Sequence, residues 1–353
     1  MTTEPDAAGR DFAALIELHR AELHAHCYRM LGSVHDAEDA LQETLIRAWR
    51  GAAGLRDGAS ARSWLYAIAT NVCLTEMERR RKRSLPHDFG AASEGQVPPG
   101  RPLLETDWLE PYPSAGMAAG KASPEARYEQ LESIELAFVA AVQHLGANQR
   151  AVLMLRDVLG FSGQETADML STSLASVSSA LQRARTTLAE RVPAATQQAS
   201  LRALGSGEVA ALVDRYVQAW ERNDVPAFAS MLAEDATFSM PPLSIWYSPR
   251  SAVVEWAARY SINGEWGWKA VVTTANAQPA LAFYAWDAAA AAYLPFALNV
   301  LSVRDGLVTD VTAFIVRGTD AKEDDAYVRF PDQPMHERLG DLYRIFGLPD
   351  RIS

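Results

Sequence analysis

The sequence predicts a multidomain chain in which two all-α domains, a helical bundle and a helix-turn-helix, precede an α+β domain. Apolar residues recur at helical spacing from 11 to 83, and two helices separated by a short turn follow between 164 and 185. Strand patterns rich in aromatic and β-branched residues then fill 236–316. A chain of 353 residues, 48% of them hydrophobic, is long enough for two or three cores. We expect domains at 10–83, 124–192 and 207–330, a linker at 84–123 and a helical tail at 331–353.

The first domain begins with a helix at Asp11–Leu31, and Ser33 then has the capping-box spacing that starts a second helix. Within that second helix, DAEDALQETLIRAWR, one stripe is apolar and should face the core: Ala37, Ala40, Leu41, Leu45, Ala48 and Trp49. The stripe leaves an acidic face outside, which we expect to dock on a protein partner: Asp36, Asp39, Gln42 and Glu43.

The third helix, RSWLYAIATNVCLTEMERRRKR, begins near Arg62 and ends in a run of basic residues. Leu65, Val72 and Cys73 lie on its apolar side, whereas Asn71 lies on its polar side. Arg79 and Arg80 in the basic run could be a solvated helix end that complements the helix dipole. Their position next to the polar side that carries Asn71 favours contact with DNA instead.

The next segment, 84–123, is rich in proline, glycine and acidic residues, and this composition predicts an extended linker. Beyond it, FSGQETADMLSTSLASVSSALQRAR predicts a helix at Gln164–Leu170, a turn at Ser171–Ser173 and a helix from Leu174. With the apolar residues packed inward, the second helix presents hydroxyls, an amide and arginines to a DNA groove and its phosphates: Ser176, Ser178, Ser179, Gln182, Arg183 and Arg185.

The C-terminal part starts with a helix around 209–220 and a second at Asp224–Leu232, for which Asp224 is the expected cap. Five strands follow, and Asp305-Gly306 between the last two predicts a tight hairpin turn. The apolar stretch Ala280–Val303 contains Asp287, Pro295 and Asn299, so it is interpreted as sheet and not as a membrane span.

Together these motifs make the chain resemble the extracytoplasmic-function (ECF) group of bacterial RNA polymerase sigma factors. DAEDALQETLIRAW and WLYAIATN resemble sigma region 2, and the helix-turn-helix resembles region 4. WLEPYP at Trp108–Pro113 resembles a subgroup with an extra C-terminal domain. The strand order and the stretch AEDATFSMPP resemble the cone-shaped SnoaL-like fold, in which a curved sheet surrounds an apolar pocket.

The resemblance implies that the acidic face docks on core RNA polymerase and that the linker threads the polymerase channel. Region 2 would then read the minus-ten element of promoter DNA as a single strand, with Leu55, Arg56, Ser60 and Asn71 as the contacts. Region 4 would place its second helix in the major groove of the minus-thirty-five element. Ser178 and Ala180 stand where many relatives carry basic residues, which predicts weaker phosphate anchoring and greater reliance on polymerase.

The net charge of −11 agrees with this interpretation, because an acidic protein opposes binding to bare DNA unless a partner offsets the charge. The alternative is a stand-alone helix-turn-helix regulator with an effector-binding domain, which would explain the second motif but not the first. Both cysteines, Cys27 and Cys73, lie on apolar helical faces, and the N-terminus lacks a signal peptide. We therefore expect a cytoplasmic protein without a membrane partner.

We expect no catalysis, cofactor or metal site. His336 is the only histidine after position 144, so the C-terminal domain lacks the commonest catalytic base. Tyr216, Tyr260 and Tyr284 are expected to be core residues whose hydroxyls each find a partner, and Asp235 a cap. His24 and Cys27 share a helical face without an evident third metal ligand. A small-molecule pocket in the cone domain could be lined by aromatic residues and a methionine: Trp220, Phe238, Met240, Trp246, Trp256 and Trp268.

Overall fold

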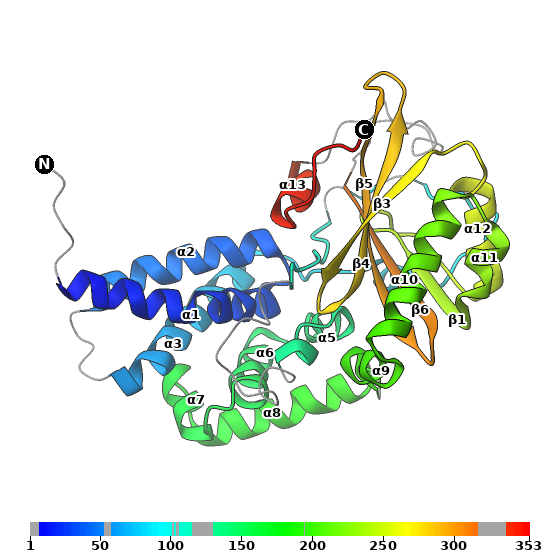
Figure 1. Cartoon of the computed structure of the whole chain (residues 1–353). Coiled ribbons are helices and arrows are strands. Elements are labelled where there is room, and N and C mark those ends of the chain that lie inside the picture. Colours follow the sequence, from blue (N-terminus) through cyan, green and yellow to red (C-terminus); the bar gives the residue numbers. More distant parts are fainter. Residues whose placement is uncertain are drawn as a thin grey trace, which may run out of the picture. The chain divides into compact units, whose positions relative to one another are not determined.

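The computed structural model describes residues 7–52, 58–100, 102–103, 106–114, 130–193, 195–316 and 337–353. It divides into two compact units, which are considered separately (Figure 1). The helical unit comprises Met1–Arg83 and Gly116–Pro193, and the sheet unit comprises Ser84–Ala115 and Ala194–Ser353. Both sigma-like motifs therefore fall in one unit, while the predicted linker belongs mainly to the other.

The first half of the helical unit is a three-helix bundle of α1 (Ala7–Leu31), α2 (Val34–Gly51) and α3 (Gly58–Arg79). Its core contains apolar residues of all three helices, and Leu23, Leu41 and Leu65 are almost fully buried. The predicted cap of α2 is confirmed, because the Ser33 hydroxyl accepts a hydrogen bond from the Asp36 backbone N–H at 3.1 Å. The third helix begins four residues before its predicted start at Arg62 and ends before most of the basic run.

The second half of the helical unit contains α5 (Leu136–Val142), α6 (Ala147–Leu153), one π-helical turn η4 (Met154–Val158), α7 (Gly163–Met169) and α8 (Leu174–Ala189). The predicted helix-turn-helix is confirmed as α7 and α8. Ser162 and Glu165 form a capping box at the start of α7, and Ser173 caps α8 through the Ser176 N–H. These caps fix the turn and so orient α8.

Two buried arginines join the halves of the helical unit. Arg29 of α1 donates hydrogen bonds to the backbone oxygens of Ser133 and Gln130, each at 3.2 Å. Arg150 of α6 donates to the Met30 oxygen and, at 2.7 Å, to the Gln143 side chain. Because the hydrogen bonds of these two buried arginines cross between the two halves, they pack the halves together within the helical unit.

The sheet unit is an α+β domain with a six-stranded mixed sheet in the order β2-β1-β6-β5-β4-β3. The strands are β1 (Leu232–Ser239), β2 (Trp246–Tyr247), β3 (Trp268–Ala275), β4 (Gln278–Asp287), β5 (Ala292–Arg304) and β6 (Leu307–Ile315). β1 and β6 pair in parallel, and the other neighbours pair antiparallel. The predicted fold class is thereby confirmed, including the hairpin at Asp305-Gly306, where both residues have positive φ.

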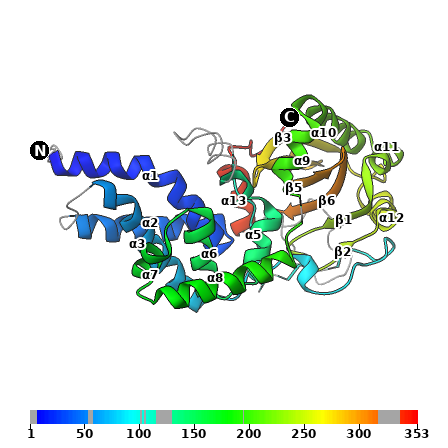
Figure 2. The same ribbon diagram turned by 90° about the horizontal axis from the view of Figure 1, so that it is seen from below.

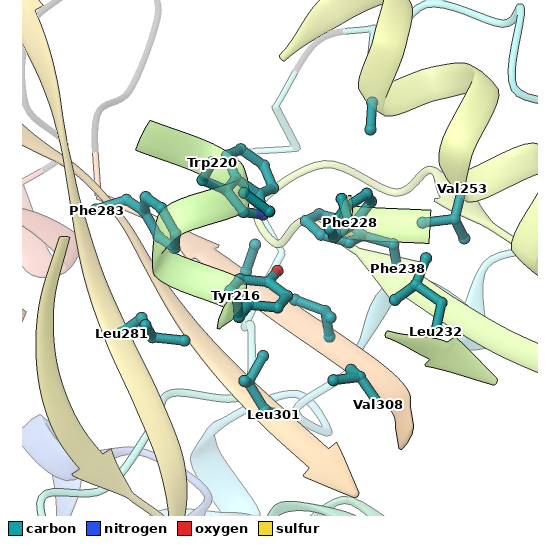
Figure 3. Packing of buried hydrophobic residues seen from close by; sticks show 14 of the residues in the cluster. Tyr216, Trp220, Phe228, Leu232, Phe238, Val253, Leu281, Phe283, Leu301 and Val308 are labelled. Atoms are coloured by element: carbon teal, nitrogen blue, oxygen red, sulfur yellow. The ribbon is translucent and has the colours of Figure 1, made fainter. Parts of the chain in front are cut away.

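Four helices precede or interrupt the strands: α9 (Gln197–Leu204), α10 (Ser206–Glu221), α11 (Val225–Ser230) and α12 (Arg250–Tyr260). In both views α10, α11 and α12 lie together beside the sheet (Figures 1 and 2). They enclose an aromatic core in which Tyr216, Trp220 and Phe228 of the helices meet Phe238 and Phe283 of the strands (Figure 3). The predicted cap Asp224 is confirmed by its bond from the Ala227 N–H at 2.9 Å.

The predicted linker is not a free connection, since its described residues lie on the sheet unit. After a 3₁₀ turn η2 (Pro86–Asp88), Ser93 pairs with Tyr247 of β2, and Pro102 pairs with Leu243. In the WLEPYP motif, Tyr112 exchanges hydrogen bonds with Asn276 in the turn between β3 and β4. Trp108, Leu109 and Tyr112 are buried, so apolar residues offset the high proline and glycine content that predicted an extended chain.

The C-terminal tail contains the helix α13 (Glu337–Ile345), and the first residues of the predicted tail lie outside the described part of the chain. The buried Tyr343 hydroxyl is 2.6 Å from the Phe283 carbonyl and 2.9 Å from the Ala297 carbonyl. Tyr284 donates to the Pro349 oxygen at 2.9 Å. The tail therefore packs on β4 and β5, which are the strands predicted from Ala280–Val303, and no described helix is long and apolar enough to cross a membrane.

Candidate functional site

The outer face of α2 differs in two ways from the predicted docking face. Asp39 and Gln42 are exposed and Glu43 is half-buried, as expected, but Asp36 is only 2% exposed. The prediction that Asp36 lies on this face is therefore wrong. Trp49, expected in the core, is 59% exposed, and Ile46 is 46% exposed.

These positions form one stripe, because residues three and four apart lie on the same side of a helix. We call Asp39, Gln42, Ile46 and Trp49 the α2 stripe. It combines polar residues with a large exposed apolar area, and such areas commonly mark protein-binding surfaces. The position of Trp49, one residue after the buried Ala48, was the signal in the sequence that could have placed it outside.

Asp36 is instead the centre of a buried ion-pair cluster. One carboxylate oxygen accepts from Arg80 and the other from Arg83, whose side chain is 6% exposed. Arg83 also donates to the Leu31 carbonyl at 3.1 Å. The basic run thus splits into two groups: Arg80 and Arg83 hold the fold together, while the Arg79 side chain is 70% exposed. Of the two arginines predicted to contact DNA, Arg79 is the one turned to solvent.

Asn71 lies on α3 with its side-chain amide facing α7 of the helix-turn-helix. It donates hydrogen bonds to the Ala67 carbonyl at 2.8 Å and to the Met169 carbonyl at 3.3 Å. In this conformation the Asn71 amide, which was predicted to read a DNA base, is bonded to the helix-turn-helix. Leu55 and Arg56 lie outside the described residues, as does the side chain of Ser60.

A second group of contacts, at another place on α3, also joins the bundle to the other half of the helical unit. The Arg62 guanidinium lies over the Tyr66 ring of the same helix at 5.1 Å and over the Phe161 ring at 4.6 Å, and it donates to the Leu159 carbonyl at 3.2 Å. Tyr66 and Phe161 themselves meet edge to face at 5.6 Å. We call the conformation with the Asn71 and Arg62 contacts in place the closed arrangement of the helical unit.

The exposed face of α8 agrees with its prediction as a groove-reading helix. All six predicted residues are exposed: Ser176, Ser178, Ser179, Gln182, Arg183 and Arg185. Val177, Ala180 and Leu181 are buried beneath them, although Leu174, expected inside, is 50% exposed. Ala180 is only 7% exposed, whereas Ser178, the other position at which many relatives carry a basic residue, is exposed.

The two arginines of α8 differ in their availability. Arg183 donates to the Ser179 hydroxyl of the same helix at 2.5 Å. Arg185 makes a two-pronged ion pair with Asp157, both N–O distances being 2.8 Å, and this pair raises the pKa of Arg185. Asp157 therefore occupies two of the five N–H donors of Arg185 and competes with a phosphate for this side chain.

The sheet unit contains an apolar cavity of about 50 Å³. Five of the six residues predicted to line a pocket do line it, namely Trp220, Phe238, Met240, Trp256 and Trp268. Trp246 does not. It lies on β2, where its indole N–H donates to the Gly90 carbonyl at 3.0 Å and its ring contacts His87. Trp246 therefore helps to hold the linker segment on the sheet unit.

The tyrosines and Asp235 of this unit give mixed outcomes. Tyr260 and Tyr284 each find a carbonyl partner, as predicted. Tyr216 does not: its buried hydroxyl has no hydrogen-bond partner among the described residues. Asp235 is not a cap but an exposed residue of β1 that pairs with Arg304 at 2.7 Å. Among the described residues, no cluster of side chains could hold a metal ion.

Comparison with known families places these features in context. Residues 15–83 match the family described as Sigma-70 region 2, and residues 135–188 match Sigma-70, region 4. The chain is 42% identical over 312 residues to the ECF RNA polymerase sigma factor SigG of Mycobacterium tuberculosis, covering 86% of this chain and 81% of that protein. It is 30% identical over 178 residues to SigM of the same organism, covering 50% of this chain and 75% of SigM.

Among solved structures, the chain is similar to the extracytoplasmic function sigma factor SigJ of Mycobacterium tuberculosis. That similarity has a TM-score of 0.54 and 20% identity, and it covers 87% of this chain and 95% of SigJ. At this identity the likeness concerns the fold, and it extends beyond the two sigma regions into the sheet unit. The identity to SigG over most of both sequences, with both sigma regions matched, shows that this chain belongs to the family of ECF RNA polymerase sigma factors.

Proposed function

We propose that this sigma factor docks on core RNA polymerase through the α2 stripe and reads promoter DNA with Asn71 and the exposed face of α8. The observation that carries the proposal is that the α2 stripe and the predicted face of α8 are both exposed, each on a capped and well-packed helix. The α2 stripe offers apolar area flanked by Asp39, and α8 offers hydroxyls and Arg183 at groove-reading spacing. Docking on polymerase also supplies the positive charge that a chain of net charge −11 lacks.

Promoter reading by Asn71 requires the closed arrangement to open. Its amide now bonds to Met169 of α7, so a nontemplate base and region 4 compete for the same donor. We infer that binding to polymerase separates the bundle from the helix-turn-helix and pays for the broken Arg62 and Asn71 contacts. The sigma factor alone would then bind promoter DNA poorly, whereas the holoenzyme would bind it well.

The test is promoter-specific transcription by reconstituted holoenzyme carrying Asn71→Ala or Arg183→Ala in the full chain. Loss of a specific base contact typically costs about 1 to 3 kcal/mol, so initiation should fall by roughly 5- to 150-fold. Glu78→Gln is the matched control, because Glu78 is exposed on α3 but carries no proposed contact. Unchanged initiation would remove the role proposed for that residue, and unaided binding to duplex operators would favour a stand-alone regulator.

We further propose that the sheet unit regulates the factor by retaining the linker segment. Residues 90–99, which we call the strap, are held by the Trp246 indole and by the hydroxyls of Tyr247 and Tyr260. The Tyr247 hydroxyl donates to the Val97 carbonyl at 2.7 Å, and the Tyr260 hydroxyl donates to the Gln96 carbonyl at 2.8 Å. A linker bound in this way is not available to thread a polymerase channel.

Gly95 provides a sharp test of linker retention. A Cβ at this position would lie 2.4 Å from the Ala252 oxygen and 2.5 Å from the Glu255 Cβ, so Gly95→Ala should detach the strap. A Cβ at Gly90 meets nothing within 4 Å, which makes Gly90→Ala the matched control. Gly95→Ala should raise transcription by holoenzyme severalfold over Gly90→Ala at limiting sigma concentration. Equal output from the two variants would refute retention as a control on activity.

A further inference from the structure

The cavity of the sheet unit contains polar atoms that the fold leaves without partners. Trp220, Trp256 and Asn299 are among the residues that line it; the indole nitrogens of the two tryptophans and the side-chain oxygen of Asn299 lie buried within the wall, and none has a hydrogen-bond partner among the described residues. The three side chains are only 4%, 2% and 2% exposed, respectively. Unpaired polar groups at this depth cost free energy, so such a group in a folded protein calls for an explanation.

Behind these groups lies the Tyr216 hydroxyl, which is also unpaired. Hydrogen-bonding interactions with the Asn299 and Trp220 side chains partly oppose the rise in its pKa that burial causes, although the geometry to each falls short of a regular hydrogen bond. Figure 3 shows the Tyr216 hydroxyl turned toward the Trp220 and Phe228 rings. One side of the apolar cavity is thus bordered by side chains with polar groups, and most of these groups are hydrogen-bond donors.

The other lining residues define what this side of the cavity could bind. They are apolar or aromatic apart from Ser261, and none of the lining residues in the described part of the chain carries a charge. A carboxylate or an amine would therefore lose its hydration without gaining an ion pair. An uncharged molecule with a carbonyl or hydroxyl oxygen would satisfy an indole N–H and bury its remaining surface against aromatic rings.

The size of the cavity shows that such a molecule needs additional space. An apolar cavity of roughly 150 Å³ admits benzene, whereas this one measures about 50 Å³. Most of the wall belongs to strands and helices of the sheet unit, but Pro99 comes from the end of the strap. Two further wall residues contact the strap directly: Tyr260 bonds to Gln96, and the Trp256 backbone lies against Gly95.

We propose that this cavity binds a small, uncharged, largely aromatic or alicyclic molecule with one carbonyl or hydroxyl oxygen, in competition with the strap. The oxygen accepts from the Trp220 or Trp256 indole N–H, and the ring occupies the space that opens when Pro99 withdraws. The proposal of a binding site depends only on the cavity and its wall. The proposed effect on transcription, that the ligand releases the linker, rests on the proposed function.

Three probes with one ring system and different substituents test the site on the full chain by isothermal titration calorimetry. Methyl naphthyl ketone carries an uncharged acceptor, naphthoate carries a charge, and ethylnaphthalene has no oxygen. The ketone should bind at least tenfold more tightly than naphthoate and about fivefold more tightly than ethylnaphthalene, the latter factor being one neutral hydrogen bond. Equal affinities, or no binding of the ketone to any variant, would overturn the site.

Variants then separate the cavity from the strap. Ala313 lines the cavity and pairs across the sheet with Asn299, so Ala313→Val should fill the space and abolish ketone binding without unfolding the chain. Gly95→Ala should bind the ketone severalfold more tightly than Gly90→Ala, because less of the protein is then in the closed state. Equal ketone affinity in the two glycine variants would refute competition with the strap.

Hydrogen exchange gives a readout that does not depend on polymerase. Amides of residues 90–97 should exchange faster when the ketone is bound, while those of β5 stay protected. Slower exchange of the strap on binding would show that ligand and strap cooperate, which contradicts the proposal. Because no transcription is measured, failure here would leave the sigma function intact, and failure of promoter assays would leave the binding site intact.

Discussion

At the scale of single residues, Asp36 and Asp39 show why helical spacing alone does not separate a docking residue from a structural one. They lie three positions apart on α2 and were predicted to share a surface. The structure buries Asp36 beneath Arg80 and Arg83 and leaves Asp39 exposed. Arg83 lies beyond the end of α3, so no periodic pattern within one helix indicates its pairing with a residue of another.

The two carboxylates therefore form a matched pair for mutation. Asp36→Asn removes the carboxylate charge that faces the buried Arg83 and the partly exposed Arg80, and the free energy of unfolding should fall by roughly 3 kcal/mol. Asp39→Asn should change it by less than about 0.5 kcal/mol but weaken binding to core polymerase. Urea denaturation and a polymerase binding assay on both variants measure the two effects. A stable Asp36→Asn variant with impaired polymerase binding would restore the original prediction.

His26 provides a second prediction for a single residue, concerning pH. Burial, together with Arg29, lowers its pKa from 6.5 to about 3. The ring is neutral in the fold: the Thr70 hydroxyl donates to the Tyr66 carbonyl at 2.7 Å, so it accepts from His26 Nε2–H at 2.9 Å. Nδ1 is left as a buried lone pair without a partner among the described residues.

Between pH 6.5 and 3 the unfolded chain binds a proton at His26 that the folded chain excludes. Stability from this group is therefore full above pH 6.5 and declines as the pH falls, by roughly 2 kcal/mol at pH 5. His26→Gln keeps a donor for Thr70 but does not titrate, so its urea midpoint should depend less on pH. His87→Gln, at an exposed position, should keep the wild-type dependence, and equal slopes in all three proteins would contradict the assignment.

At the scale of elements, the patterns that predicted correctly are those set by local chemistry. The caps Ser33 and Asp224, the turn at Asp305-Gly306 and the helix-turn-helix all depend on residues close together in sequence. The elements missed depend on distant partners. The helix α12, with Trp256 and Tyr260 on it, is defined by packing on β1 and the strap. The helix α9, which was not predicted from the sequence, is held by bonds of Gln197 and Gln198 to the sheet and its turn.

The candidate sites divide in the same way. Exposure of the six α8 residues followed from the periodicity of one helix, whereas the five correctly predicted cavity residues followed from their aromatic or apolar side chains within a cone-like domain. The engagement of Asn71 by Met169 and the retention of the linker by Trp246 could not be predicted, since each joins segments about a hundred residues apart or more. Such pairings depend on tertiary packing that the local sequence pattern does not encode.

A prediction at the level of α8 concerns Asp157, which competes with DNA phosphate for Arg185. Asp157 holds Arg185 in a bidentate pair on the surface. Asp157→Asn should free Arg185 and remove a negative charge near the groove, raising holoenzyme affinity for minus-thirty-five DNA about two- to fivefold at low salt. Filter binding at several salt concentrations measures this. The double variant Asp157→Asn with Arg185→Ala should lose most of the gain, and a gain that persists would assign it to other groups.

At the scale of the whole molecule, the helical unit carries both the residues proposed to read DNA and the contacts that engage one of them, Asn71. The helix α3 is joined to the helix-turn-helix half at two places, through Asn71 with Met169 and through Arg62 with Leu159 and Phe161. The Asn71 amide is engaged while these contacts persist, although the predicted face of α8 stays exposed. Under the proposed function, the closed arrangement thus gives a physical reason, in addition to net charge, for Asn71 to read promoters only on polymerase.

Removing the Arg62 side chain should shift the helical unit toward an open form. Its cation–π contact with Phe161 and its bond to the Leu159 carbonyl are the contacts that cross the unit, and together they are worth roughly 1.5 kcal/mol, which corresponds to about a tenfold change in the equilibrium between closed and open forms. Arg62→Ala should therefore enlarge the radius of gyration in small-angle scattering and speed hydrogen exchange in α7. Arg79→Ala also removes one positive charge but no contact across the helical unit, so it should do neither. Identical scattering and exchange for the two variants would mean that Arg62 does not hold the unit closed.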